Sequence, residues 1–218
     1  MNKKSIMALA VAFGITSNLL TLPSSLDVSP FRNRPLNIKP ALEERVDLRT
    51  GKKIMVENSK LEEYHEWKKS TVDWSKKCND YALVVNKAER ELTVYYNGTA
   101  IDSFLVGLSP RPIGHKLYGW DLHTPEGLYG VYEKKAKSVF YKSLMINYPN
   151  PSDRIRFSEN KKNGLIPEKK VIGSNIAIHG AGNERDWTYG CIALSNQDMD
   201  RLFLWAKFCT PVTIIGYE

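Results

Sequence analysis

From Tyr81 onward the sequence is a series of short apolar segments separated by turn residues, which is typical of β structure. The clearest unit is Glu91–Tyr96, an alternating run followed at once by Asn97-Gly98. Asn-Gly readily adopts the positive φ angles of a two-residue hairpin turn, so residues 100–107 should return antiparallel. The same reasoning predicts strands at residues 81–86, 127–134, 144–148 and 172–179. The pattern favours a mainly β fold with short helices, a β-sandwich or barrel-like domain, over a parallel α/β sheet.

Two segments have the apolar spacing of amphipathic helices, and a third is polar. Residues 196–208 follow a capping residue, Ser195 or Asn196, and carry acids in the first turn. The core-facing positions of this helix are Met199, Leu202, Phe203 and Ala206. Residues 58–69 predict a shorter helix, and residues 153–170 a helix or an excursion near the cleft.

The N-terminal part of the chain predicts export. Lys3 and Lys4 precede an uncharged, mostly apolar run at residues 6–22, which indicates a signal peptide or an uncleaved anchor at residues 1–22 and a possible inner-membrane tether. Residues 23–79 read as a tether containing the short helix, because prolines stand at 23, 30, 35 and 40. Residues 80–218 then form the folded domain, which we expect in the periplasm or cell envelope.

The charge of the chain does not indicate nucleic acid binding. The net charge is +7 and the pI about 9.2, but the lysines are scattered in pairs and no basic helix is interleaved with aromatic residues. A solvated basic surface is one interpretation, and attraction to anionic cell-wall polymers is the other.

Residues 178–194 contain the groups of a thiol chemistry. His179 precedes Cys191 by twelve residues, and Gly190 stands directly before the cysteine. A thiol is only weakly ionised at neutral pH, but a neighbouring imidazole can take its proton. A glycine lets backbone approach a substrate, and consecutive N–H groups there can form an oxyanion hole. Apolar residues on both sides predict strands that hold the two groups in a cleft.

These residues resemble the active-site signature of L,D-transpeptidases with the YkuD-type catalytic domain. The resemblance rests on I-H-G at residues 178–180 and W-T-Y-G-C-I-A-L at 187–194. It extends to H-T-P-E-G-L-Y at 123–129, L-M-I-N-Y-P at 144–149 and T-P-V-T-I at 210–214. It implies an enzyme acting on peptidoglycan stem peptides, with an amine acceptor or water as the second substrate and no cofactor.

The resemblance also implies roles for individual residues. Cys191 would be the nucleophile, His179 the base and then the acid, and the carbonyl of Gly180 would orient the imidazole. The oxyanion and substrate-binding residues would be Gly190, Tyr189, Thr188, Trp187 and His123. His115, Asp121 and His123 lack the spacing of a metal site, so we expect no metal.

The sequence departs from the family pattern beside the cysteine. Ala193 stands where most members have an arginine that is thought to position an anionic part of the donor, and the closest sub-group has G-C-I-A-L. Arg154 and Arg156 are the nearest candidates to replace that arginine, whereas Arg185 and Asp186 read as a solvated loop pair. A hydrolase of the same fold, a carboxypeptidase, endopeptidase or murein–protein amidase, is therefore an alternative, and a non-catalytic wall-binding module is a second.

Three cysteines are present, at positions 78, 191 and 209. Cys78 precedes the first predicted strand of the domain and Cys209 the last. Terminal strands often lie near each other, so a disulfide between them is one expectation and two reduced thiols the other.

Overall fold

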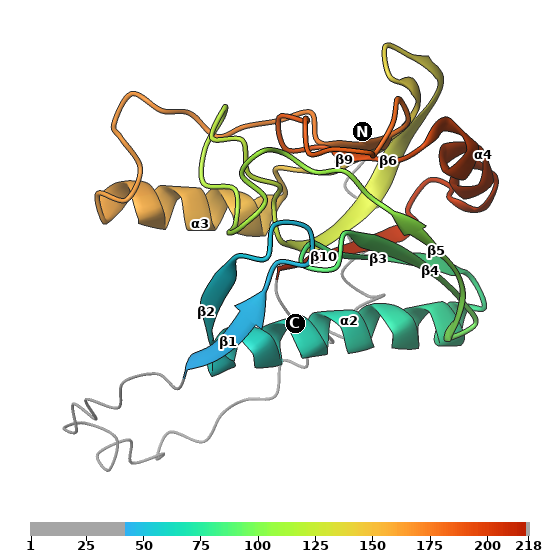
Figure 1. Ribbon diagram of the computed structural model, residues 1–218, viewed down its shortest axis with the longest axis horizontal. Coiled ribbons are helices and arrows are strands. Elements are labelled where there is room, and N and C mark those ends of the chain that lie inside the picture. The colour runs from blue at the N-terminus through green and yellow to red at the C-terminus, as the bar shows by residue number, and fades with distance from the viewer. Residues whose placement is uncertain (1–41, 217–218) are drawn as a thin grey trace, which may run out of the picture. The chain divides into compact units, whose positions relative to one another are not determined.

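One curled eight-stranded sheet forms the centre of the computed structural model, which describes residues 42–216 (Figure 1). The strand order is β5-β4-β3-β10-β6-β7-β8-β9. The bounds are β3 Tyr81–Asn86, β4 Glu91–Tyr96, β5 Thr99–Leu105, β6 Gly127–Ser138, β7 Tyr141–Ile146, β8 Ala177–His179, β9 Ile192–Ala193 and β10 Pro211–Ile215. The expected mainly β class with short helices is confirmed.

The strand β6 makes the sheet curl. Its first residues, up to Gly130, pair with β10, and its register then shifts after Val131, where pairing with β7 begins. Figure 1 shows β6 rising from the layer of β3, β4 and β10 toward β9. Side chains from both parts meet in one core that includes Leu83, Leu92, Ile178 and Leu194. Burial of each such side chain contributes roughly 1.5–3 kcal/mol, so this core fixes where β8 and β9 end.

The predicted hairpin is confirmed. Asn97 and Gly98 have φ angles of 49° and 77°, and Glu91–Tyr96 pairs antiparallel with β5. A Cβ on Gly98 would also lie 2.9 Å from the Cβ of Lys76. Both the turn and the close approach of a helix therefore require glycine.

The helix α2 spans Asn58–Cys78, nine residues beyond the predicted end at 69. Its buried stripe begins with Leu61 and Tyr64 and continues with Thr71 and Ser75. The hydroxyl of Ser75 donates to the carbonyl of Asp80 at 2.7 Å, and that of Thr71 is bonded to Thr213 of β10. Small hydroxyl residues can pack against a sheet once they are hydrogen-bonded. A prediction based on apolar spacing alone therefore ended the helix too early.

The segment before α2 contains regular structure where a tether was expected. β1, Leu42–Val46, and β2, Lys53–Glu57, form an antiparallel hairpin. Between them Asp47 closes the turn by accepting the backbone N–H of Thr50 at 2.8 Å. The expected signal or anchor segment, residues 1–22, lies outside the described residues. No helix within residues 42–216 has the length and apolar run that a bilayer crossing needs.

Three other predicted elements differ in extent. The polar segment forms a helix, α3, over Pro151–Lys162, which begins with a capping box between Asn150 and Asp153. The strand expected at 172–179 is confined to β8, because Gly173 and Asn175, the latter with φ 60°, interrupt it. The last helix, α4, ends at Trp205 rather than 208.

The first and last strands of the domain, β3 and β10, are parallel neighbours, so the predicted proximity of the terminal strands is confirmed. Cys78 and Cys209 are nevertheless free and exposed, and Cys191 is the third free thiol. The backbone N–H of Cys209 donates to Val131 at 2.8 Å in a left-handed turn. The structure therefore contains the two reduced thiols of the second expectation rather than the bridge.

Candidate active site

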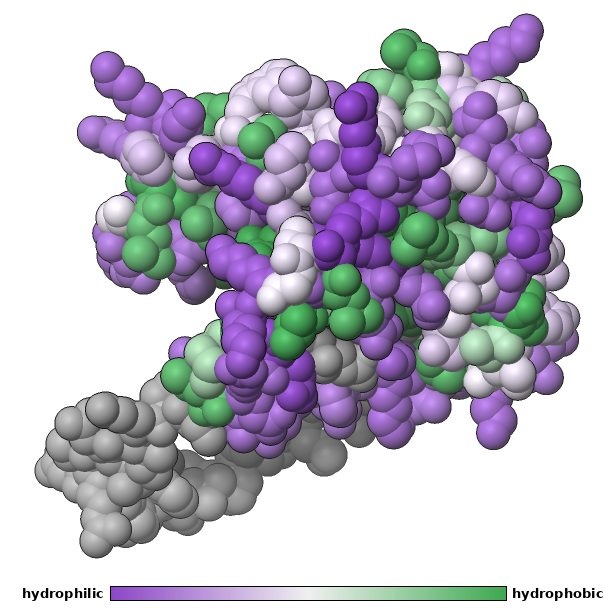
Figure 2. Space-filling model, viewed as in Figure 1, coloured by the Kyte–Doolittle hydropathy of each residue, from purple (hydrophilic) through white to green (hydrophobic). Residues whose placement is uncertain are grey.

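A cavity of about 560 Å³ brings His179 and Cys191 together. On the surface drawn in Figure 2, apolar side chains lie in small patches among hydrophilic ones, whereas the cavity gathers several aromatic rings. Its lining consists of Lys116, Gly119, Trp120, Phe140, residues 171–176, His179, Trp187, Thr188, Tyr189 and Cys191. A concave site with aromatic walls and a few converging polar groups is the usual form of a ligand site.

His179 is held at the end of β8 as a neutral imidazole. Its Nδ1 lies 2.7 Å from the carbonyl oxygen of Gly180, which can only accept, so Nδ1 carries the proton and Nε2 keeps its lone pair. Burial lowers the pKa of His179, an effect that this hydrogen bond only partly opposes. The ring of Phe140 stacks on the imidazole with centroids 4.6 Å apart.

Cys191 lies directly before β9 and is half-buried. Its Sγ donates to the carbonyl of Asn175 at 3.7 Å. Burial raises the pKa of the Cys191 thiol, although a backbone hydrogen bond from Ala177 and the charge of Lys116 act in the other direction. Both shifts favour the neutral forms of the two groups, a thiol and an unprotonated imidazole.

Gly190 is required by its conformation and its surroundings. Its φ is 119°, and a Cβ would lie 2.6 Å from the carbonyl oxygen of His123. Thr188 holds the same turn, because its Oγ1 donates to the carbonyl of Cys191 at 2.8 Å and accepts the N–H of Gly190 at 3.3 Å. The N–H of Gly190, expected in the oxyanion hole, is thus engaged within the turn.

Of the other predicted site residues, two line the cavity and His123 does not. Trp187 and Tyr189 line the cavity, and the ring of Tyr189 meets Trp120 with centroids 5.8 Å apart. His123 is not among the lining residues and instead supports Gly190 from behind through its backbone. Among residues 42–216, no group of three His, Cys, Asp or Glu side chains could hold a metal ion.

The one lysine or arginine among the residues that line the cavity is Lys116, which the sequence did not single out. Lys116 lines the cavity, is 3% exposed and pairs with Asp121 at 2.7 Å. Arg154 and Arg156 do not line the cavity, and Arg156 instead lies 2.8 Å from the Nε2 of His115. Ala193 is fully buried. No local signal could reveal Lys116, because its place depends on the path of the loop that carries it.

That loop, residues 113–126, is fastened to the core by buried charges. The Lys87 ammonium donates to the carbonyl of Gly114 at 2.6 Å and to Glu126 Oε1 at 2.9 Å. Tyr64 of α2 donates to the other oxygen of Glu126 at 2.7 Å. Burial alone raises the pKa of Glu126, but Lys87, with the Tyr64 hydroxyl and His115, more than offsets this and the pKa falls to about 2.

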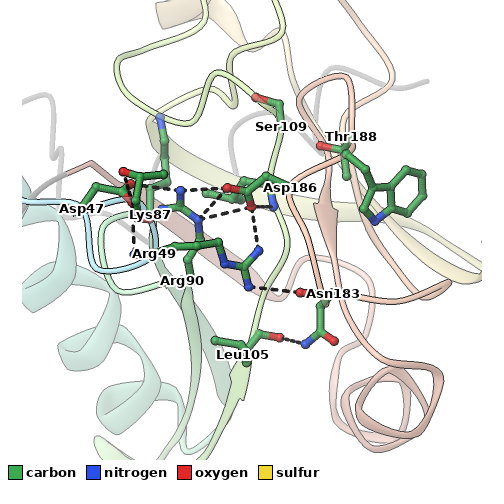
Figure 3. Close-up of polar contacts among 12 residues, drawn as sticks. Asp47, Arg49, Lys87, Arg90, Leu105, Ser109, Asn183, Asp186 and Thr188 are labelled. Atoms are coloured by element: carbon green, nitrogen blue, oxygen red, sulfur yellow. Dashed lines mark hydrogen bonds and ion pairs between the residues drawn. The ribbon is translucent and has the colours of Figure 1, made fainter. Parts of the chain in front are cut away.

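The nucleophile loop, residues 180–191, is anchored by Asp186, so the prediction of a solvated loop residue is wrong. Figure 3 shows its carboxylate between Arg90 and Arg49, with Asp47 on the far side of Arg90. The shortest distances from Asp186 to each arginine are 3.0 Å. Because Arg90 is 1% exposed, Asp186 is a partner of a buried charge rather than a surface residue.

Comparison with known proteins identifies the class. The family model of the YkuD L,D-transpeptidase catalytic domain matches residues 80–214, and the chain belongs to this family. A curated relative, the putative L,D-transpeptidase YafK of Escherichia coli K12, is 29% identical over 140 residues. The aligned region covers 62% of this chain, and the chain spans about half, 49%, of the length of that relative.

Two solved structures of similar proteins align with 65% and 63% of the chain. Bd1075 of Bdellovibrio bacteriovorus aligns over 65% of this chain and 50% of its own, with 23% identity and a TM-score of 0.48. The catalytic domain of an Enterococcus faecium (E. faecium) L,D-transpeptidase aligns over 63% of this chain and 98% of its own, with 15% identity and a TM-score of 0.42.

Proposed function

We propose that this protein is a peptidoglycan-modifying cysteine acyltransferase of the L,D-transpeptidase type, exported to the cell envelope. The observation that carries the proposal is that His179 and Cys191 line one cavity while the Gly180 carbonyl holds the imidazole with Nε2 as its free base. Membership of the family supports stem peptides as substrates. A wall-binding module would have no use for a thiol beside an oriented imidazole.

The two half-reactions follow from this geometry. Nε2 of His179 takes the thiol proton as Sγ of Cys191 attacks the carbonyl between an L-centre and a D-residue. The tetrahedral intermediate collapses, the C–N bond breaks, and the imidazolium gives its proton to the leaving amine. An amine or water, deprotonated by Nε2, then attacks the thioester and releases the thiol. Because the N–H of Gly190 is engaged by Thr188, the N–H groups of Cys191 and Tyr189 are the proposed oxyanion donors.

Lys116 supports a site for an anionic group of the donor peptide. It is the one lysine or arginine among the residues that line the cavity, and Asp121 is the single acceptor of its three N–H bonds within the described residues. Its remaining donors suit a carboxylate of the stem peptide, the role that the missing arginine at position 193 would otherwise serve.

Hydrolysis is the second candidate outcome, and Ala193 favours it. The alanine is fully buried and makes no charged contact, so Lys116 is the one cation among the cavity-lining residues that can hold an anionic group of the donor. We expect water to compete with the amine for the thioester.

One experiment tests both outcomes. The purified protein is incubated with defined tetrapeptide muropeptides, with and without an added amine acceptor, and the products are weighed by mass spectrometry. Released D-residue with a shortened stem peptide indicates hydrolysis, and a new cross-link indicates transfer. The Cys191→Ala variant serves as the control and should give no product. If the wild-type protein also gives no product under either condition, the proposal is contradicted.

A further inference from the structure

We propose that Arg49 and Asp47, in the hairpin that precedes the catalytic domain, are positioning residues for the nucleophile loop. The inference rests on the proposed function in one respect, that Cys191 is the nucleophile. The family model begins at residue 80, so both side chains come from outside the matched domain. In Figure 3 Arg49 contacts Asp186 and Asn183 of the loop, and Asp47 lies beside Arg90.

Arg49 contacts the nucleophile loop directly at two points. Its Nη1 lies 3.0 Å from Oδ1 of Asp186, and its Nη2 donates to the carbonyl oxygen of Asn183 at 3.1 Å. The planar guanidinium therefore joins two positions of the loop that are three residues apart. Two hydrogen bonds from one rigid fork restrict the loop more than a single point charge would.

Asp47 fixes the turn that carries Arg49 and also pairs with Arg90. Asp47, Arg49, Arg90 and Asp186 together form a charge cluster. Its Oδ1 accepts the Oγ1 hydroxyl and the backbone N–H of Thr50, both at 2.8 Å, and the N–H of Arg49 at 3.2 Å. Its Oδ2 pairs with Arg90 at 3.0 Å. The turn between β1 and β2 is thus closed by the same carboxylate that neutralises a buried arginine.

The cluster is a neutral set of two carboxylates and two guanidinium groups. Arg90 has a side chain that is 2% exposed, and Asp47 has none of its side chain exposed. A charge removed from water in this way needs its partners, so each member constrains the others. Asp186 can therefore take only the position that serves Arg90 and Arg49 together.

Asp186 transmits this constraint to the thiol. Its Oδ1 accepts the N–H of Leu108 at 2.8 Å, and the Leu108 carbonyl accepts the N–H groups of Trp187 and Thr188 at 2.8 and 2.9 Å. Thr188 in turn bonds the carbonyl of Cys191. An unbroken series of contacts thus leads from the hairpin to the oxyanion site, and loosening Arg49 should misplace the N–H donors there.

The test compares two reactions of Cys191 in the full chain with Cys78→Ser and Cys209→Ser. Acylation by p-nitrophenyl acetate passes through an oxyanion, and alkylation by iodoacetamide does not. The ratio of their rate constants therefore reports oxyanion alignment, since accessibility and ionisation of the thiol affect both reactions. We expect Arg49→Met to lower the ratio at least tenfold, because one lost oxyanion donor typically costs about 10²–10³ in rate.

Other variants separate positioning from stability. Arg49→Lys keeps the charge but cannot bond Asp186 and Asn183 through one fork, so it should lower the ratio by an intermediate amount. Lys53→Met, an exposed cation of the same hairpin, should leave the ratio unchanged. Asp47→Asn should lower it as Arg49→Met does, with all variants assayed well below their measured Tm. If the parent shows no Cys191-dependent acylation, the nucleophile assignment of the proposed function fails. If the parent is acylated and both Arg49→Met and Asp47→Asn keep its ratio, the positioning role is overturned while the proposed function stands.

Discussion

The Nδ1 of His179 lies 2.7 Å from the carbonyl oxygen of Gly180, the residue that follows it in the chain. This contact selects the tautomer whose Nε2 is free to accept a proton. A carbonyl replaces the carboxylate found in many catalytic triads, so it orients the ring without adding a negative charge that would favour the imidazolium. Burial lowers the pKa of the imidazole further. The base is therefore neutral and ready before substrate binds.

A neutral resting pair predicts a particular pH dependence. Only the thiolate reacts with iodoacetamide, and burial raises the pKa of Cys191 above its ordinary value of 9.0. In protein with Cys78→Ser and Cys209→Ser, the alkylation rate should still be rising above pH 9, with glutathione measured in parallel as the reference. A rate that is already constant between pH 6 and 7 would show a preformed ion pair and contradict this assignment.

Thr188→Val should lower turnover with little effect on the fold. The substitution keeps the shape but removes the Oγ1 that bonds the Cys191 carbonyl and the Gly190 N–H. A hydrogen bond of this kind contributes about 1 kcal/mol, which corresponds to roughly a fivefold loss in kcat. Thr188→Ser retains the hydroxyl and serves as the control. Equal kcat values for the valine and serine variants would exclude the role given to Oγ1.

Lys116→Met should weaken binding of donors that carry a free carboxylate. We expect KM for a tetrapeptide with a free C-terminal carboxylate to rise about tenfold, and KM for the same peptide with a C-terminal amide to stay near the wild-type value. Because the substitution leaves Asp121 uncompensated, the double variant Lys116→Met/Asp121→Asn is measured as well. Similar changes for the acid and the amide would refute recognition of that carboxylate.

Glu126 predicts a loss of stability in acid. Its pKa is about 2 in the folded protein, against an ordinary value of 4.5. Between these values the unfolded chain binds more protons, so the free energy of unfolding should fall as pH drops from about 5 to 2. Urea unfolding at several pH values measures this. Glu126→Gln should be less stable near pH 7 and should lose part of the pH dependence, whereas Glu62→Gln, an exposed carboxylate on α2, should match the wild type.

Local patterns predicted the strands whose neighbours are close in the sequence. The alternation in Glu91–Tyr96 and the Asn97-Gly98 turn lie within one hairpin, so the sequence contains all the interactions that form them. The juxtaposition of His179 and Cys191 also followed from sequence, because strand signals on both sides of the loop implied that its ends lie together. The pairing of Ile178 with Ile192 brings those ends together.

Other features depend on contacts between distant segments and left no local signal. The extension of α2 relies on hydrogen bonds from Thr71 and Ser75, which look like solvent-facing residues in a sequence. Phe140 lies in the turn between β6 and β7, and it stacks on the imidazole because β7 pairs with β8, the strand that carries His179. The sequence predicts a solvated Asp186, because its partner Arg49 is 137 positions away and leaves no local signal.

The central claim is that Cys191 forms an acyl-enzyme with a stem peptide. The most direct measurement is the mass of the intact protein, quenched in acid within seconds of mixing with a tetrapeptide muropeptide, followed by mapping of the modified residue. We predict an added mass equal to the donor without its terminal D-residue, located on Cys191 and absent in Cys191→Ala. Turnover of the muropeptide by the Cys191→Ala variant, or an adduct on any other residue, would contradict the account.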